Sequence, residues 1–129
     1  MSERLEQLAR AAVDCGFQLH QELGPGLLES VYETCLAHSL AERGFHVERQ
    51  RVIPIRYRGV TLDEAFRADV LVEGSLLIEV KSTEAYSPVH AKQVITYLRL
   101  MNLPLGLLMN FGAATFKEGV KRLANNYFG

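Results

Sequence analysis

The chain has 129 residues and a formal net charge of −1, with 48% apolar and 22% charged residues. This length is sufficient for one domain with a substantial core, and this balance is typical of globular proteins. No apolar run reaches the 18 residues of a membrane-spanning helix, and the first residues lack the pattern of a signal peptide. We therefore expect one cytoplasmic domain over residues 1–129 without a membrane partner, in which the thiols of Cys15 and Cys35 are reduced.

Charge is distributed unevenly along the chain. Residues 1–42 contain two arginines and seven acidic residues, whereas residues 43–129 contain twelve basic and eight acidic residues. The basic residues of the second part could form a face that binds phosphates, or only the solvated side of a curved sheet. They include Arg49, Arg51, Arg56, Arg58, Arg67, Lys117, Lys121 and Arg122.

The first forty residues have the hydrophobic period of two helices. Apolar residues at helical spacing predict a helix over residues 4–22, which Gly24-Pro25-Gly26 ends. A second helix is predicted from about Leu27 to Arg43, with Gly44 as its C-terminal cap. Its predicted apolar stripe consists of Leu27, Leu28, Val31, Tyr32, Cys35, Leu36 and Leu40.

Glu29 lies at the edge of this stripe. The helix dipole favours a glutamate in the first turn of a helix, and this alone would explain its presence. The same carboxylate could instead reach over the rim of the core into a functional site. We expect Tyr32 to anchor the core beside that site rather than to act in catalysis.

From residue 46 the hydrophobic period changes to two, which predicts strands. The first predicted strand covers residues 46–57. Pro54 within it indicates an edge strand or a bulge, because proline has no N–H for a ladder hydrogen bond. Residues 58–65 are expected to form a connection to two further strands, at residues 66–72 and 76–81.

These two further strands carry charged residues where a buried strand should be apolar. Asp69 lies on one strand, and Glu79 and Lys81 lie on the other. A two-residue turn would place Asp69 opposite Ile78, and the two carboxylates would then point to opposite faces. A three-residue turn at residues 73–75 would place Asp69 opposite Glu79. A shared carboxylate site therefore requires an odd loop length or a bulge.

The remaining residues predict a strand–helix–strand unit. Ser87 is a suitable N-cap for a helix that Asn102-Leu103-Pro104 ends. The apolar run at residues 105–111 predicts a strand that is buried on both faces and parallel to the preceding strand. Residues 114–117 are expected to add a short strand, and residues 120–123 a last strand or a turn of helix.

Gln93 and Tyr97 are four residues apart in the predicted third helix, so their side chains share one face with that of His90. Taken alone, such a pair is usually a surface feature.

In this order the motifs resemble the PD-(D/E)XK, or restriction-endonuclease-like, nuclease superfamily. Asp69 followed by Glu79-Val80-Lys81 resembles its central motif, although Ala68 replaces the proline that names the superfamily. Gln93-x-x-x-Tyr97 resembles the QxxxY element of RecB-like nucleases. The heptapeptide at residues 26–32 matches GxxExxY, the signature that names a small family within the superfamily. His20, Pro88-x-His90 and Asn110-Phe111-Gly112 also resemble that family.

The resemblance implies an α/β (α+β-like) fold with a restriction-endonuclease-like three-layer core. Its mixed β-sheet would be flanked by helices in the order ααβββαβ(β). The implied activity is hydrolysis of DNA phosphodiester bonds with Mg²⁺ or Mn²⁺ as cofactor. The implied metal ligands are Asp69, Glu79, the carbonyl of Val80, and Glu29. Lys81 would act on the attacking water or on the transition state, and Gln93 and Tyr97 would support the site or contact the DNA backbone.

Several alternatives remain open on the residues alone. Asp69 could form a structural ion pair with Lys81 or with Arg67. The chain could be a nuclease-like module that binds nucleic acid or acts as a scaffold without cleaving, or a small metal enzyme that acts on another phosphoester. The expected partners are nucleic acid, a second copy of the chain, and a protein that supplies affinity.

Overall fold

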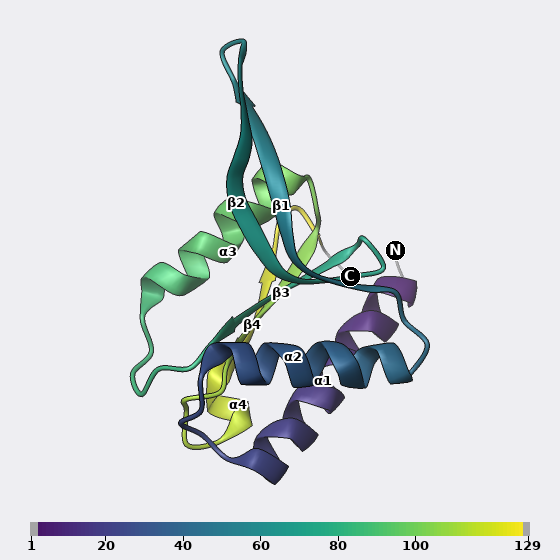
Figure 1. Ribbon diagram of the computed structural model, residues 1–129, viewed down its shortest axis with the longest axis vertical. Coiled ribbons are helices and arrows are strands. Elements are labelled where there is room, and N and C mark those ends of the chain that lie inside the picture. Colours follow the sequence, from purple (N-terminus) through teal and green to yellow (C-terminus); the bar gives the residue numbers. More distant parts are fainter. Residues whose placement is uncertain (1–2, 128–129) are drawn as a thin grey trace.

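A computed structural model describes residues 3–127. The helices and strands appear in Figure 1. They are α1 (Glu3–Leu23), α2 (Glu29–Glu42), β1 (Val47–Tyr57), β2 (Val60–Val72), β3 (Leu76–Lys81), α3 (Pro88–Met101), β4 (Leu105–Asn110), α4 (Phe116–Gly119) and β5 (Val120–Ala124). None of the helices over residues 3–127 is both long and apolar enough to cross a membrane.

The strands form one mixed sheet in which their order in space equals their order in the chain, β1-β2-β3-β4-β5. β3 and β4 are parallel, and the other neighbouring strands are antiparallel. α3 connects the two parallel strands, which confirms the predicted strand–helix–strand unit. β4 is buried over nearly its whole length, as its continuous apolar run predicts.

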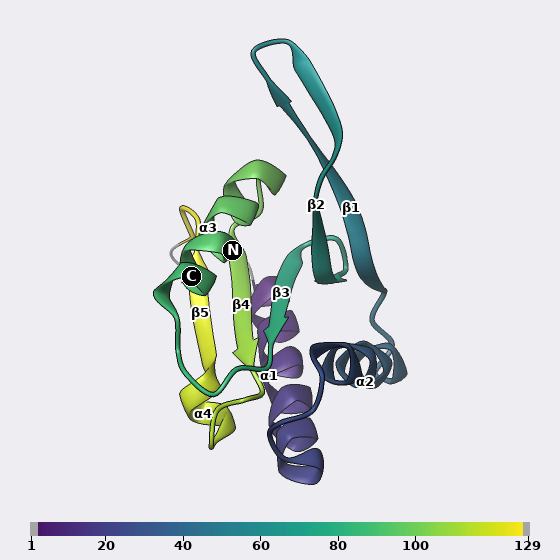
Figure 2. The ribbon, with the colours of Figure 1, turned by 60° about the vertical axis from the view of Figure 1, so that its left-hand side comes forward.

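Helices cover both faces of the sheet (Figure 2). Successive side chains of a strand point to opposite faces, so each central strand contributes to two cores. Leu76, Ile78 and Val80 of β3 pack with residues of α1 and α2. Leu77 lies in the other core, where it packs with residues of α3 such as Val94. The predicted three-layer fold, a mixed sheet flanked by helices, is confirmed.

β1 and β2 extend beyond the helices as a long two-stranded arm (Figures 1 and 2). The prediction of a connection over residues 58–65 was wrong, because β2 already begins at Val60. Only Arg58 and Gly59 form the turn, and both have positive φ, 48° and 83°. A two-residue turn with this backbone matches the twist of the two strands. β1 and β2 therefore stay paired through the polar residues up to the turn.

Pro54 lies on β1, which is an edge of the sheet. The register between β1 and β2 shifts between Ile53 and Ile55. The sequence predicted an edge strand or a bulge at this proline, and the structure has both features. The missing N–H of proline therefore costs no ladder hydrogen bond.

α2 begins at Glu29, two residues later than predicted. Leu27, Leu28 and Val31 are exposed, so the first turn of the predicted apolar stripe was wrong. Tyr32 provides the physical reason, because its hydroxyl accepts a hydrogen bond from the N–H of Leu27 and donates one to the carbonyl of Gly24. These bonds hold the preceding segment as a turn outside the helix. The residues that α2 buries are Tyr32, Glu33, Leu36, Ala37 and Leu40.

Tyr32 is fully buried, and its ring stacks on that of Phe111 with centroids 4.5 Å apart. Its predicted role as a core anchor is confirmed. His20 packs nearby, where its Nε2 lies 2.9 Å from the carbonyl oxygen of Ala113. These contacts connect the turn before α2 to the end of β4.

The predicted short strand at residues 114–117 was wrong, since Phe116–Gly119 forms α4. Thr115 and Glu118 form a capping box, in which each side chain bonds the backbone N–H of the other residue. This local pairing favours a helical turn over a strand. The last predicted strand is confirmed as β5.

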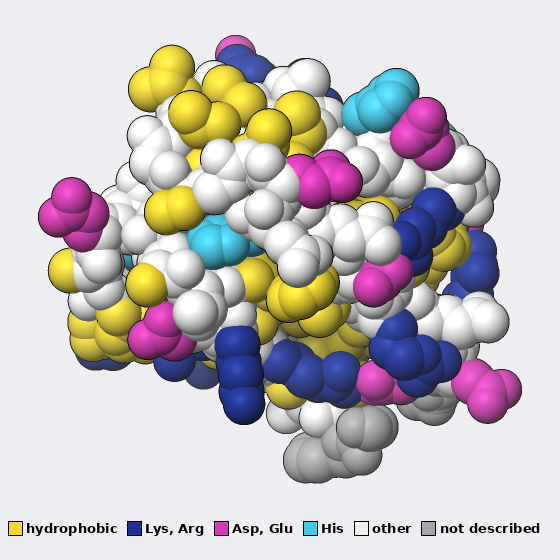
Figure 3. All heavy atoms as spheres, turned by 90° about the horizontal axis from the view of Figure 1, so that it is seen from below, with side chains coloured by type: hydrophobic (Ala, Val, Ile, Leu, Met, Phe, Trp, Pro, Cys, Tyr) yellow, Lys and Arg dark blue, Asp and Glu magenta, His cyan; other side chains and the backbone are white. Residues whose placement is uncertain are grey.

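The basic residues of the second part do not form one face. Those on the arm and those around β5 lie at opposite edges of the sheet. Five of them pair with acidic residues, in the pairs Arg43–Asp14, Arg49–Glu33, Arg51–Glu48, Arg67–Glu64 and Arg122–Glu6. Figure 3 likewise shows Asp and Glu side chains among the Lys and Arg side chains of one face. This arrangement agrees with solvated charged residues better than with one continuous phosphate-binding surface.

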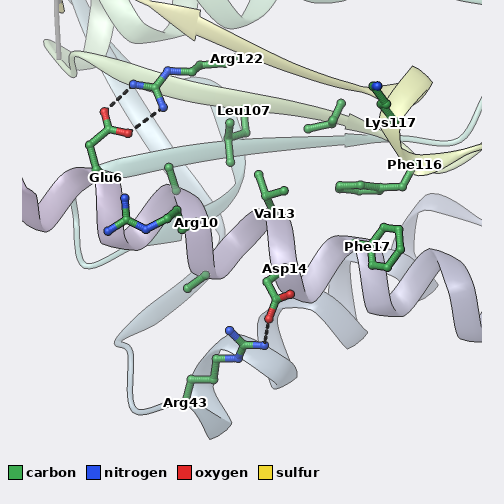
Figure 4. Close-up of a pocket in the computed structure, with 13 residues that line it drawn as sticks. Glu6, Arg10, Val13, Asp14, Phe17, Arg43, Leu107, Phe116, Lys117 and Arg122 are labelled. Atoms are coloured by element: carbon green, nitrogen blue, oxygen red, sulfur yellow. Dashed lines mark hydrogen bonds and ion pairs between the residues drawn. The ribbon is translucent and has the colours of Figure 1, made fainter.

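A cavity of about 940 Å³ lies between α1 and the segment that includes α4 and β5. Figure 4 shows Val13, Leu107 and Phe116 along it and two ion pairs at its rim. The pairs join Arg122 to Glu6 and Arg43 to Asp14. None of its lining residues is a predicted site residue, so this cavity is separate from the site described below.

We expect Gly112→Ala to lower the free energy of unfolding by about 1–3 kcal/mol. The side chain of Asn110 bonds the backbone of both Thr83 and Gly112, so the segment after β3 lies directly against Gly112. A Cβ at Gly112 would collide with the backbone of Thr83. Urea denaturation measures the loss.

The matched control for this substitution is Gly59→Asn at the tip of the arm. A Cβ at Gly59 would meet no atom within 4 Å. Asparagine tolerates the left-handed backbone of this position better than most residues, so we expect a loss of about 1 kcal/mol or less, smaller than that of Gly112→Ala. Equal losses of unfolding free energy in Gly112→Ala and Gly59→Asn would contradict a collision at Gly112.

Candidate functional site

β2 and β3 pair over only three residues each, from Val70 opposite Ile78 to Val72 opposite Leu76. The loop between them therefore has three residues, which confirms the loop length that a shared site requires. On the other side of Val70, β2 continues beside β1 into the arm, whereas β3 continues beside β4. The two strands thus separate at Asp69 and Glu79.

Each of these two carboxylates bonds the backbone of the opposite strand where the ladder ends. An oxygen of Asp69 accepts a hydrogen bond from the N–H of Val80, at 2.9 Å. An oxygen of Glu79 accepts one from the N–H of Asp69, also at 2.9 Å. Both N–H groups are satisfied in this way although the strands have separated. The crossed hydrogen bonds also fix the two carboxylates beside each other.

Glu79 is one of the few buried charged residues, with 3% of its surface exposed. Burial, and then the negative charge of Asp69, raise the pKa of Glu79 to about 8, while the hydrogen bond from the Asp69 N–H and the charge of Lys81 oppose the rise. Two like charges this close, one on the buried Glu79 and one on the partly buried Asp69, favour either a proton or a bound cation. At neutral pH this pair is therefore suited to accept a cation.

Lys81 shares the strand face of Glu79, because it lies two residues further along β3. Its side chain forms no ion pair or hydrogen bond with any residue from 3 to 127. Arg67 pairs with Glu64. Neither of the two structural ion pairs considered for Asp69 is therefore present, and the ammonium group of Lys81 is available for other partners.

The carbonyl of Val80 also faces the separation between the strands. The carbonyl of Lys81 accepts a hydrogen bond from the N–H of Phe111, so the backbone polar groups of Lys81 face β4. Those of the adjacent residue point the other way, as the bond from Val80 N–H to Asp69 demonstrates. The predicted carbonyl ligand thus lies on the side of the carboxylates.

α3 contributes Tyr97 and Gln93 from the face that covers the sheet. Burial, followed by the charges of Glu79 and Asp69, raises the pKa of Tyr97, so its hydroxyl lies within their field. Its ring stacks on that of Phe66 with centroids 4.0 Å apart. One turn earlier, Oε1 of Gln93 is buried without a hydrogen-bond partner among the described residues. Such an acceptor is costly unless a ligand or water binds it.

Among residues 3–127, Glu29 is joined to this cluster by no hydrogen bond or ion pair. Glu29 is exposed at the start of α2, and no interaction within residues 3–127 joins it to Asp69 or Glu79. Glu33, one helical turn later, is buried instead, with 5% of its surface exposed. Burial raises the pKa of Glu33, and the charge of Asp69 raises it further. The helix therefore does present a carboxylate toward Asp69, but from the next turn.

Gln50 and Arg49 of β1 join Glu33 to the cluster. Nε2 of Gln50 donates to Oε1 of Glu33 at 2.7 Å and to Oδ1 of Asp69 at 3.1 Å. Arg49 donates to the other oxygen of Glu33, at 2.9 Å from its Nη2. Sequence reasoning missed all three residues. The available signal was the position of Glu33 directly after Tyr32, on the buried side of α2.

The donor set fits a hard divalent cation. Asp69, Glu79 and the carbonyl of Val80 present oxygen atoms, which Mg²⁺ and Mn²⁺ prefer. Over residues 3–127, no group of three or more His, Cys, Asp or Glu side chains is arranged as a metal site. A cation here would have two carboxylates and a backbone oxygen, with water in the other positions, and Mg²⁺ is commonly held by so few protein ligands.

A mixed sheet between helices, with two carboxylates and a lysine where two strands separate, is the arrangement of a nuclease-like domain. A family model described as the PD-(D/E)XK nuclease superfamily matches residues 6–123. The chain belongs to this superfamily. Comparisons with curated proteins and with solved structures gave no match. Nucleases of this superfamily generally use divalent metals.

Proposed function

We propose that this chain is a nuclease that hydrolyses DNA phosphodiester bonds with Mg²⁺ or Mn²⁺ as cofactor. The crossed hydrogen bonds of Asp69 and Glu79 carry the proposal, because they hold one buried and one partly buried carboxylate beside each other, ready for one cation. Asp69, Glu79 and the Val80 carbonyl would be its ligands. In this proposal, the carboxylate that α2 contributes beside the site is that of Glu33 and not that of Glu29. The match of residues 26–32 to GxxExxY supports placing the chain in that smaller family.

The chain's own residues would divide the reaction between binding and charge stabilisation. A bound divalent cation supplies polarisation of the phosphate and a lower pKa for bound water. Lys81, whose ammonium has no hydrogen bond or ion pair among residues 3–127, donates to the attacking water or to the charge that develops on the phosphate oxygens. The unpartnered oxygen of Gln93 accepts a hydrogen bond from water or substrate. Tyr97 donates from the same helix face.

The test is a cleavage panel of duplex DNA, single-stranded DNA and RNA with Mg²⁺, with Mn²⁺, or with EDTA. We expect cleavage only with a divalent cation. In Asp69→Ala the cleavage rate should fall by about 100-fold or more, because Asp69 would bind the cation and also accepts the hydrogen bond from the N–H of Val80. Asp63→Ala, at an exposed position of the arm, should keep the wild-type rate. Cleavage in EDTA, or equal rates in Asp69→Ala and wild type, would refute the proposal.

A second candidate function is a nucleic-acid-binding or scaffold module that does not cleave. The separation of the basic residues to opposite edges of the sheet favours it, because no long phosphate-binding surface results. Binding of labelled DNA by the chain, without cleavage under any cation condition of the panel, would support this second function. The homodimer and the cytoplasmic location stay predictions, and light scattering of the purified chain tests the first.

A further inference from the structure

Gln50 has a left-handed backbone in the middle of β1, with φ of 50°. Residues with a side chain rarely adopt this conformation, and within a strand it interrupts pairing. The ladder between β1 and β2 indeed passes over it. Arg49 pairs with Val70 and Arg51 pairs with Ala68, so Gln50 stands opposite Asp69 at a step that the ladder leaves out. A local conformation of this kind persists only where surrounding contacts hold it.

The contacts that hold Gln50 are those of its side-chain amide. Its NH₂ group has two hydrogens, and it donates to Glu33 at 2.7 Å and to Asp69 at 3.1 Å. The amide is neutral, so it bridges two carboxylates without adding charge. Arg49 holds the second oxygen of Glu33, which keeps the bridge attached to α2.

The bridge completes the orientation of the Asp69 carboxylate. Oδ2 accepts from the N–H of Val80 and Oδ1 accepts from Gln50. With one donor on each oxygen, the plane of the carboxylate cannot rotate freely. Each oxygen still has a lone pair for a cation.

We propose that Gln50 is a positioning residue of the cation site, which fixes Asp69 and connects it to Glu33. The proposal rests on the proposed function, since it assumes that Asp69 is a cation ligand. The strained backbone of Gln50 is the means by which β1, rather than β2 or β3, delivers this amide. Residues that orient a metal ligand typically contribute 10–100-fold in metal affinity.

Two substitutions separate positioning from folding. Gln50→Met keeps the side-chain length and the unfavourable backbone but removes the donor. Gln50→Gly removes the donor and also relieves the backbone, because glycine adopts positive φ readily. We expect both variants to bind Mn²⁺ about 10–100-fold more weakly than wild type. In urea denaturation, the glycine variant should be more stable than the methionine variant.

The affinity is measured from the electron paramagnetic resonance signal of free Mn²⁺, in the absence of substrate. Gln21→Met, at an exposed position of α1, is the control and should match wild type. Wild-type affinity in both Gln50 variants would overturn the positioning role and leave the proposed function intact. A wild-type chain that binds no Mn²⁺ would overturn both. Affinity losses that follow the stability losses, with glycine less affected than methionine, would indicate a structural role only and would also overturn the inference.

Discussion

Replacing Lys81 with methionine should lower the rate of DNA cleavage by about 100-fold or more, while Mn²⁺ affinity changes only a few-fold. The Lys81 side chain forms no hydrogen bond or ion pair with residues 3–127, so its replacement breaks neither. An ammonium group beside the reacting phosphate acts mainly on charge that develops in the transition state. Methionine keeps the length and apolar stem of the side chain but not this charge.

Single-turnover cleavage with saturating DNA measures the rate, and Mn²⁺ titration at pH 8.5 measures the affinity. The high pH limits competition from protons, because Lys81 normally lowers the pKa of Glu79 and its removal strengthens proton binding there. Lys92→Met is the matched control, since Lys92 is exposed on α3. Wild-type cleavage by Lys81→Met, or a loss of Mn²⁺ binding as large as the loss of rate, would argue against this role.

Without a cation, the free energy of unfolding of the chain should fall as the pH rises from about 4.5 to about 8. The folded state raises the pKa of Glu79 from 4.5 to about 8, so it binds this proton more tightly than the unfolded state does. The stabilisation by the proton is complete below pH 4.5 and is lost as the pH rises through 8. Each unit of this shift corresponds to about 1.4 kcal/mol, so the total reaches several kcal/mol.

Glu79→Gln should remove most of this dependence, because glutamine keeps an acceptor for the Asp69 N–H and does not ionise. Urea denaturation in EDTA at several pH values measures the difference. The pKa of Glu33 is shifted in the same direction in both proteins, so the difference between them isolates Glu79. Asp63→Asn is the control at an exposed carboxylate. Parallel curves of unfolding free energy for wild type and Glu79→Gln between pH 5 and 8 would contradict the raised pKa of the buried Glu79 carboxyl group.

Much of the fold follows from local sequence signals. The change of hydrophobic period at residue 46 predicted the sheet, and the continuous apolar run of β4 predicted a strand buried inside it. The arm was missed because its turn, Arg58-Gly59, lies in a polar segment that resembles a connection. α4 was missed because its capping box stabilises a helix of only four residues. In both cases two or three residues determined the local structure against the broader pattern.

The site divides between residues that local reasoning can find and residues that it cannot. Asp69 and Glu79 are visible as charges within apolar strands, and turn geometry predicted the loop that joins them. Glu33 and Gln50 are ordinary polar residues in the sequence. Their place in the site depends on tertiary contacts, and no sequence pattern predicts the positive φ of Gln50.

The position of β1 and β5 at the two edges of the sheet also affects how copies of this chain meet one another. An edge strand exposes unpaired N–H and C=O groups, which can recruit a strand from another molecule and start aggregation. β5 has only five residues and carries Lys121 and Arg122. β1 carries Pro54 and the register shift beside it. Both edges are thus poor templates for intermolecular sheet growth, although the long hairpin of β1 and β2 is exposed.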